Sequence, residues 1–241
     1  MGRLDDIQAL VGESRRQLSE IEKRYGEGLN AKQIPSGLGV LVKNYLENLR
    51  SSLDYVASET WSTALRSTKP RGVYFPINTM SAAEFAARMK KDFPELETKA
   101  PALYAVFAKL QAFEKDGCHS FPKLNSLVND NKHDQLSPQS RTEARSLEVR
   151  FGGGASIQVP PGASISGHGT ISSGGGWIQL SGGTVSGSNP ATAGGGPVQQ
   201  FVTIWVSFTF TSTGDEVVNL LKACMNDVQR VIENVKPHLW P

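Results

Sequence analysis

Charged residues are missing from a long part of this 241-residue sequence. From Phe151 to Gly214 there is no Asp, Glu, Lys or Arg, and the same stretch holds 16 of the 24 glycines. Charged side chains normally prevent the exposed edges of a sheet from pairing with another chain. Their absence leaves two alternatives for any sheet formed here: its edges are covered within the chain, or a second subunit or another partner covers them.

Cysteines and long apolar runs are also scarce. The two cysteines, Cys118 and Cys224, lie far apart, which excludes a secreted disulfide framework and gives no paired spacing for a zinc site. No stretch reaches the roughly 18 apolar residues of a membrane span, and the N-terminus has no apolar segment typical of a signal peptide. We therefore expect a cytoplasmic protein with reduced thiols, no membrane partner and no metal or other cofactor.

A strong charge of one sign is absent as well. The chain has 25 Lys and Arg against 23 Asp and Glu, so its net charge is +2. A nearly balanced chain has no general attraction to nucleic acids or membrane surfaces. Any binding of a polyanion must therefore depend on a local group of side chains.

Amphipathic patterns predict a mainly helical protein. Residues 3–25 carry apolar side chains at steps of three and four, which is typical of a helix that packs in a bundle. Ser81 and Glu84 have the spacing of a capping box, which predicts that a helix begins there. Further helices are expected over 38–67, from Pro101 to Gly117, from Ser120 to Pro138 at the latest, and from a cap at Asp215 to about Lys236, where Pro237 would end the helix.

The glycine-rich stretch has the pattern of β-strands. In "FVTIWVSFTF", residues 201–210, apolar side chains alternate along one face, as in a half-buried strand. Shorter runs such as "ASIQV" and "GWIQL" are predicted strands between glycine-rich turns. We predict an α+β fold in which a helical bundle (1–148) precedes a Gly/Ser/Thr-rich antiparallel β segment (149–213), and a C-terminal helix (214–241) packs back on the bundle.

Asn129, Lys132 and His133 form a polar group near the end of the helix that begins at Ser120. Asn129 and His133 are four residues apart and share a helix face, with Lys132 at its margin. An imidazole can transfer protons near neutral pH, while an amide and an ammonium group can orient or neutralise a phosphate. The alternative is structural, and simpler: Lys132 and His133 would offset the negative end of the helix dipole, and Asn129 would bond locally.

Arg50 and Asp54 are a second polar pair, four residues apart on the helix predicted over 38–67. On a surface they would form a weak intrahelical salt bridge. If Arg50 faces His133 across the bundle instead, the two would form a phosphate-binding and proton-transfer pair suited to RNA cleavage. The spacing of Cys118 and the histidines after it is too unspecific to predict a metal site.

Three segments in a fixed order carry a resemblance to known proteins. They are "LRSSLDYVASE", "YFPI" and "FPKLNSLVNDNKHDQL", followed by strands and a terminal helix. The chain resembles a family of uncharacterised bacterial helical proteins in which a Leu-Arg-Ser-x-Leu-Asp helix, a Phe-Pro-Ile segment and an Asn-x-x-Lys-His helix recur in this order. Its layout also resembles the HEPN superfamily, many members of which are ribonucleases of toxin and antiphage systems.

The HEPN resemblance implies roles for His133 and for a nearby cation. The hallmark of that superfamily is an Arg followed by a polar residue and, a few positions on, a His. His133 matches the His, whereas Val128 and Asn129 stand where the Arg is expected. Arg50 is then the cation that would replace it, with Asn129 and Lys132 completing the site.

Two hypotheses of function follow. The first is a HEPN-like protein of bacterial stress or phage defence that binds or cleaves RNA with His133, Asn129, Lys132 and Arg50. As an enzyme it would be a metal-independent ribonuclease. The second is a non-catalytic oligomerising or adaptor protein, in which the uncharged β segment forms a homo-oligomer or contacts a protein partner.

Overall fold

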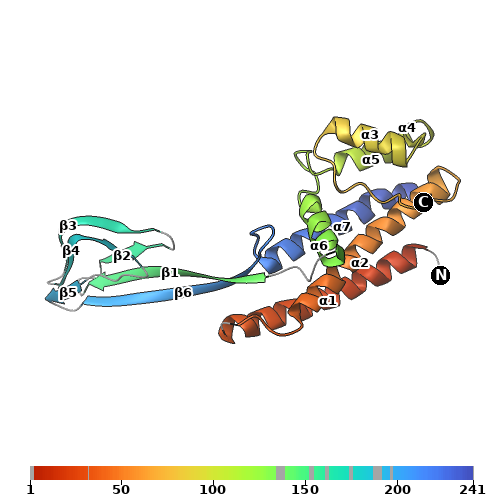
Figure 1. Cartoon of the computed structure of the whole chain (residues 1–241). Helices are drawn as coiled ribbons and strands as arrows, with labels where there is room; N and C mark the ends of the chain where they lie inside the picture. The colour runs from red at the N-terminus through yellow and green to blue at the C-terminus, as the bar shows by residue number, and fades with distance from the viewer. Residues whose placement is uncertain are drawn as a thin grey trace. The chain divides into compact units, whose positions relative to one another are not determined.

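The chain forms two compact units. The structure, a computed structural model, describes residues 3–31, 33–133, 139–151, 155–160, 163–173, 176–186, 192–195 and 198–240. The helical unit comprises residues 1–140 and 208–241, and the β unit comprises residues 141–207. Figure 1 labels their helices and strands.

Helices precede the strands in sequence, and one helix follows them. The helical elements are α1 (Arg3–Ala31), α2 (Leu38–Glu59), the π-helical turn η1 (Thr60–Ala64), α3 (Ala82–Asp92), α4 (Leu96–Lys99), α5 (Pro101–Lys109), α6 (Phe121–His133) and α7 (Val217–Leu239). The strands are β1 (Gln139–Phe151), β2 (Ser156–Val159), β3 (Ile165–Ser173), β4 (Gly176–Val185), β5 (Thr192–Gly195) and β6 (Val198–Phe210). The prediction of a mixed α+β, mainly helical fold is confirmed, although β1 begins ahead of the predicted boundary at residue 149.

The core of the helical unit is built around α2, which contacts α1, α6 and α7. Its leucines Leu46, Leu49 and Leu53 are fully buried. The hydroxyl of Tyr45 donates a hydrogen bond to the carbonyl oxygen of Leu221 over 2.7 Å, which joins α2 to α7. The C-terminal helix therefore packs on the N-terminal helices, as Figure 1 shows.

Several helix ends differ from the predicted ones. α1 continues to Ala31, past the predicted end at residue 25. Gly28 lies inside this helix, where the lack of a side chain allows other groups to approach closely. A Cβ at Gly28 would lie 2.7 Å from Cδ of Pro35 and 2.9 Å from Cε2 of Phe208. α2 gives way to η1 at Thr60 and α5 ends at Lys109, both earlier than expected.

Both ends of α7 also correct the prediction. Glu216, rather than Asp215, is the N-cap, and its carboxylate accepts hydrogen bonds from the first turn. Asp215 instead pairs with Lys123, at 2.6 Å, a partner too distant in sequence to be foreseen. Pro237 lies within the last turn, where the helix continues to the buried Leu239.

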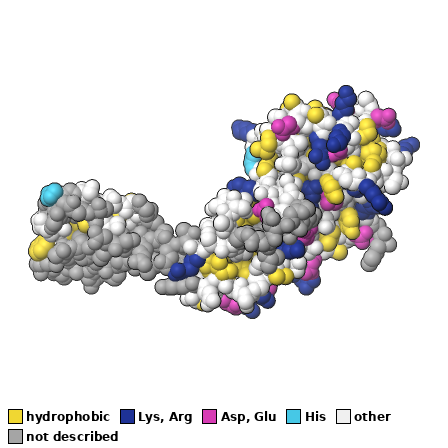
Figure 2. All heavy atoms as spheres, viewed as in Figure 1, with side chains coloured by type: hydrophobic (Ala, Val, Ile, Leu, Met, Phe, Trp, Pro, Cys, Tyr) yellow, Lys and Arg dark blue, Asp and Glu magenta, His cyan; other side chains and the backbone are white. Residues whose placement is uncertain are grey.

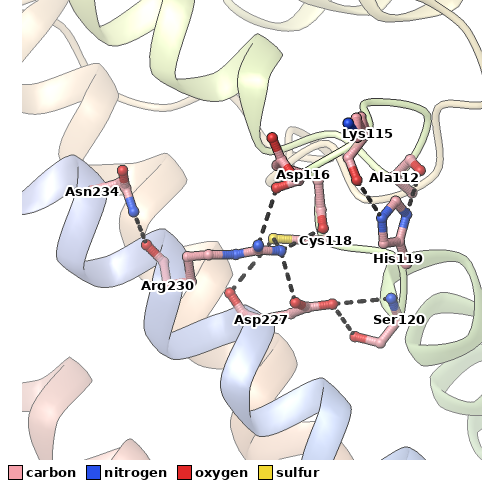
Figure 3. A network of polar contacts seen from close by, with 10 residues as sticks. Ala112, Lys115, Asp116, Cys118, His119, Ser120, Asp227, Arg230 and Asn234 are labelled. Carbon is pink, nitrogen blue, oxygen red and sulfur yellow. Dashed lines mark hydrogen bonds and ion pairs between the residues drawn. The ribbon is translucent and has the colours of Figure 1, made fainter.

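A polar network fastens the connection between α5 and α6 to α7 (Figure 3). Oδ2 of Asp227 accepts hydrogen bonds from the backbone nitrogen of Ser120, at 3.0 Å, and from its hydroxyl, at 2.7 Å. Arg230 donates to Oδ1 of Asp227 at 2.9 Å and to the carbonyl oxygen of Gly117, and its Nη2 lies 3.3 Å from Sγ of Cys118. A carboxylate from α7 thus sits at the N-terminus of α6, where the helix dipole favours negative charge.

The β unit has a small core of its own. Its strands form two sheets, in the orders β2-β1-β6 and β3-β4-β5, and the pairs β1–β2, β3–β4 and β4–β5 are antiparallel. Buried side chains from β1, β2 and β4 share one apolar cluster, comprising Leu147, Val149, Phe151, Val159, Ile178 and Val185.

The last strand leads back into the helical unit. Of the apolar face predicted for residues 201–210, Phe208 and Phe210 are buried, while the side chains of 201–206 lie outside the described part. The hydroxyls of Ser140 and Thr209 are 3.1 Å apart. The chain therefore leaves and re-enters the helical unit at neighbouring points.

Candidate functional site

A cavity of about 340 Å³ lies in the helical unit, between α2, α3, α6 and the segment before α3. It contains two of the predicted site residues, Arg50 from α2 and Asn129 from α6. The described residues that line it are Arg50, Asp54, Tyr74, Phe75, Pro76, Ile77, Asn78, Thr79, Arg88, Asn125, Val128 and Asn129. Helices far apart in sequence thus bring the predicted cation and the predicted amide to the same cavity.

Arg50 is held at the margin of the α2 core. Its side chain is only 12% exposed, and Nη2 lies 3.4 Å from Oδ1 of Asp54. The guanidinium carbon is 5.5 Å from the ring centroid of Tyr74. Within the described part of the chain, Nη1 of Arg50 is buried and has no hydrogen-bond partner. A buried cationic donor without an acceptor is costly, and an anion in the cavity would reduce that cost.

Two arginine side chains meet at the cavity. Burial lowers the pKa of Arg50, Asp54 raises it, and the nearby charge of Arg88 lowers it further. Arginine stays charged despite such shifts, so two guanidinium groups repel each other here. Arg88 also pairs with Asp92, on its own helix. The described lining residues include two arginines and one aspartate, and the amide groups of Asn125 and Asn129 can donate hydrogen bonds.

The segment between η1 and α3 forms one wall of the cavity. Val73, Phe75, Ile77 and Thr79 are buried, while Tyr74 between the first two is 46% exposed. Apart from the buried Pro76, the segment alternates between buried and exposed residues. This alternation is that of an extended chain with one face on a core. The ring of Phe75 packs against two other aromatic rings, at centroid distances of 4.9 and 6.2 Å. The "YFPI" segment therefore has a fixed backbone that presents Tyr74 outward.

The remaining predicted residues lie on α6. Asn129 lines the cavity, and His133 is the last residue of the helix, one turn further on. The side chains of Lys132 and His133 lie outside the described residues, so their distances to Arg50 stay untested. Lys123, the basic residue of α6 that precedes Asn129, pairs with Asp215.

Sequence reasoning missed Arg88 and Tyr74. Arg88 is four residues before Asp92, a spacing common on exposed helix faces, and Tyr74 belongs to a segment without periodic helix signals. The "YFPI" segment could have directed attention to Tyr74, because Tyr74, Ile77 and the two residues between them line the cavity. In the described ranges, no three His, Cys, Asp or Glu side chains are grouped as metal ligands.

The visible face of the helical unit carries charges of both signs. On the visible face of the helical unit, Lys and Arg side chains are interspersed with Asp and Glu (Figure 2). Among the helices that the structure describes, none combines the length and apolar character that crossing a bilayer requires.

Comparisons with known proteins add no assignment. The chain matches no protein-family model, and no curated protein or solved structure is significantly similar to it.

Proposed function

We propose that the helical unit binds RNA by placing a backbone phosphate in the cavity between Arg50, Arg88 and Asn129. The observation that carries this proposal is the buried guanidinium of Arg50, which lines a cavity beside a second arginine. A phosphate oxygen would supply the acceptor that Nη1 of Arg50 lacks among the described residues. Its negative charge would also lie between the positive charges of Arg50 and Arg88. RNA is the phosphate ligand that the resemblance to the HEPN superfamily implies.

A catalytic role is the further step of the same proposal. His133 is one turn beyond Asn129 in α6, so both residues belong to the same side of that helix. A histidine next to a bound phosphate can remove the proton of the ribose 2′-hydroxyl or protonate the leaving oxygen. The protein would then cleave RNA without a metal ion, in bacterial stress or phage defence.

RNA binding is tested by fluorescence anisotropy with a labelled single-stranded RNA. Arg50→Met removes the cation, and we expect it to weaken binding about 10- to 150-fold, the loss of one charge-assisted hydrogen bond. The slope of log affinity against log salt should fall by about 0.7, the contribution of one phosphate contact. The control is Arg24→Met, because Arg24 also pairs with a carboxylate four residues away, Glu20, but does so on a more exposed face away from the cavity.

A second variant guards against a folding defect. Asn129→Asp keeps the shape of the side chain but adds a negative charge to the cavity wall, so it should also weaken binding. Wild-type affinity in both Arg50→Met and Asn129→Asp would refute the RNA site.

Cleavage of RNA is tested separately, in the presence of EDTA. The His133→Ala variant should bind RNA and leave it intact. If the wild-type protein also leaves the RNA uncleaved, the function is limited to binding.

A second candidate function rests on the β unit. In the described pairings, β2 and β6 are the outer strands of one sheet and β3 and β5 those of the other. Since residues 151–207 contain no charge, these strands lack the usual protection against pairing with another chain. The protein would then be an oligomerising or adaptor protein. Light scattering on the chain without residues 152–197 tests this idea, and an unchanged mass and unchanged partner binding would count against it.

A further inference from the structure

Tyr74 is an exposed aromatic ring on the wall of the cavity. Its side chain is 46% exposed, although the residues on either side, Val73 and Phe75, are buried. Because these neighbours fix the backbone, the ring is presented to solvent from a rigid position. A large exposed aromatic side chain on a fixed backbone is a common feature of surfaces that bind planar ligands.

Two cations accompany this ring. Cζ of Arg50 and Nζ of Lys69 each lie over the ring, 5.5 Å from its centroid, so a base would stack on the part of the ring that they leave exposed. Lys69 also donates a hydrogen bond to the carbonyl oxygen of Val73, which closes the turn before the extended segment. Arg50 belongs to the cavity proposed to hold a phosphate, so the ring stands directly beside that cavity and has a second positive charge next to it.

We infer that Tyr74 is a stacking platform for a base, and that the ligand is therefore single-stranded RNA rather than a duplex. This inference rests on the proposed function, since it requires a phosphate in the cavity. Bases in a duplex are stacked on one another and their faces are inaccessible, whereas an unpaired base can stack on a tyrosine. Stacking accepts every base, so the site would have little sequence preference.

The arrangement assigns a separate role to each group. Arg50 and Arg88 hold the phosphate, Tyr74 holds the base attached to it, and Lys69 is placed near the backbone of the adjoining nucleotide. The two contacts involve different chemical parts of the same ligand. They can therefore be removed independently, either by changing the protein or by changing the RNA.

The test measures the anisotropy of a fluorescein-labelled single-stranded RNA, of its duplex, and of the same strand with abasic sites. Tyr74→Leu should weaken binding of the single strand about 5- to 150-fold, and Tyr74→Phe should bind as the wild type does. Binding of the duplex and of the abasic strand should be equal in the wild type and in Tyr74→Leu. The matched control is Tyr55→Leu, because Tyr55 is 39% exposed on α2 but does not line the cavity.

The outcomes separate this inference from the proposed function. If Tyr74→Leu binds the single strand as tightly as the wild type while Arg50→Met binds weakly, the platform is refuted and the phosphate site stands. If Tyr74→Leu weakens the single strand, the duplex and the abasic strand alike, the ring acts only by positioning Arg50, which also refutes the platform. If neither variant changes binding, both proposals fail.

Discussion

Replacing Asp227 by alanine should destabilise the helical unit by about 3 kcal/mol. The two hydrogen bonds from Ser120 dominate, because that residue is only 5% exposed and directly precedes the first residue of α6. A hydrogen bond to a charged group contributes about 1.5–3 kcal/mol, and we take the lower value for each since both use Oδ2. The pair with Arg230 adds about 0–1 kcal/mol, because the arginine side chain is 37% exposed.

Urea unfolding followed by circular dichroism at 222 nm measures this change, since the helices belong to the helical unit. In a thermal unfolding experiment, the melting temperature of the same variant should fall by roughly 6–12 °C. Asp227→Asn keeps an acceptor for Ser120 and should lose only about 1 kcal/mol, while Glu233→Ala, on the exposed face of the same helix, should stay within about 0.5 kcal/mol of the wild type. A loss below about 1 kcal/mol for Asp227→Ala, or equal losses for alanine and asparagine, would refute the capping role.

Three further predictions concern the rest of the chain. Gly117→Ala should cost about 2–4 kcal/mol in the same urea assay, because the new Cβ would lie 1.8 Å from the carbonyl oxygen of Gln111; a wild-type midpoint would contradict this. Burial raises the pKa of the Cys118 thiol to about 11, so only about a thousandth of this thiol is ionised at pH 8. A disulfide reagent should therefore react with it rapidly only after urea is added. A chain with residues 141–207 replaced by a short Gly/Ser linker should keep its helical spectrum and cooperative melting, and loss of either would show that the helical unit depends on the β unit.

Local sequence signals predicted the parts of the fold that depend on near neighbours. The predicted cap at Ser81 is confirmed, because its hydroxyl accepts from the backbone nitrogen of Glu84 at 3.2 Å. The Glu84 carboxylate accepts from the nitrogen of Met80 at 2.8 Å, one residue before the position that a capping box uses. The stripe of apolar residues in α7 likewise predicted a helix that packs on the others. Both signals act over one or two helical turns, which a sequence shows directly.

The candidate site could be predicted only in part, because its contacts are long-range. Arg50 forms the expected pair with Asp54, but the same spacing would occur on an exposed helix face. Its burial depends on the wall formed by residues 73–80 and on α6, which no local pattern reveals. Asp215 is a second example. It is predicted to cap α7, but it forms an ion pair with Lys123 of α6, and Glu216 caps α7 instead.

The contact between Tyr45 and Leu221 has a consequence for synthesis on the ribosome. These residues are 176 positions apart, and the whole β unit is translated between them. While it emerges, α1 and α2 lack the partner that covers their apolar faces, so the helical unit stays incomplete until α7 is made. Closing such a long-range contact is slow, and uncovered apolar faces invite aggregation. We therefore expect the β unit to fold first and chaperones to raise the yield of the full chain.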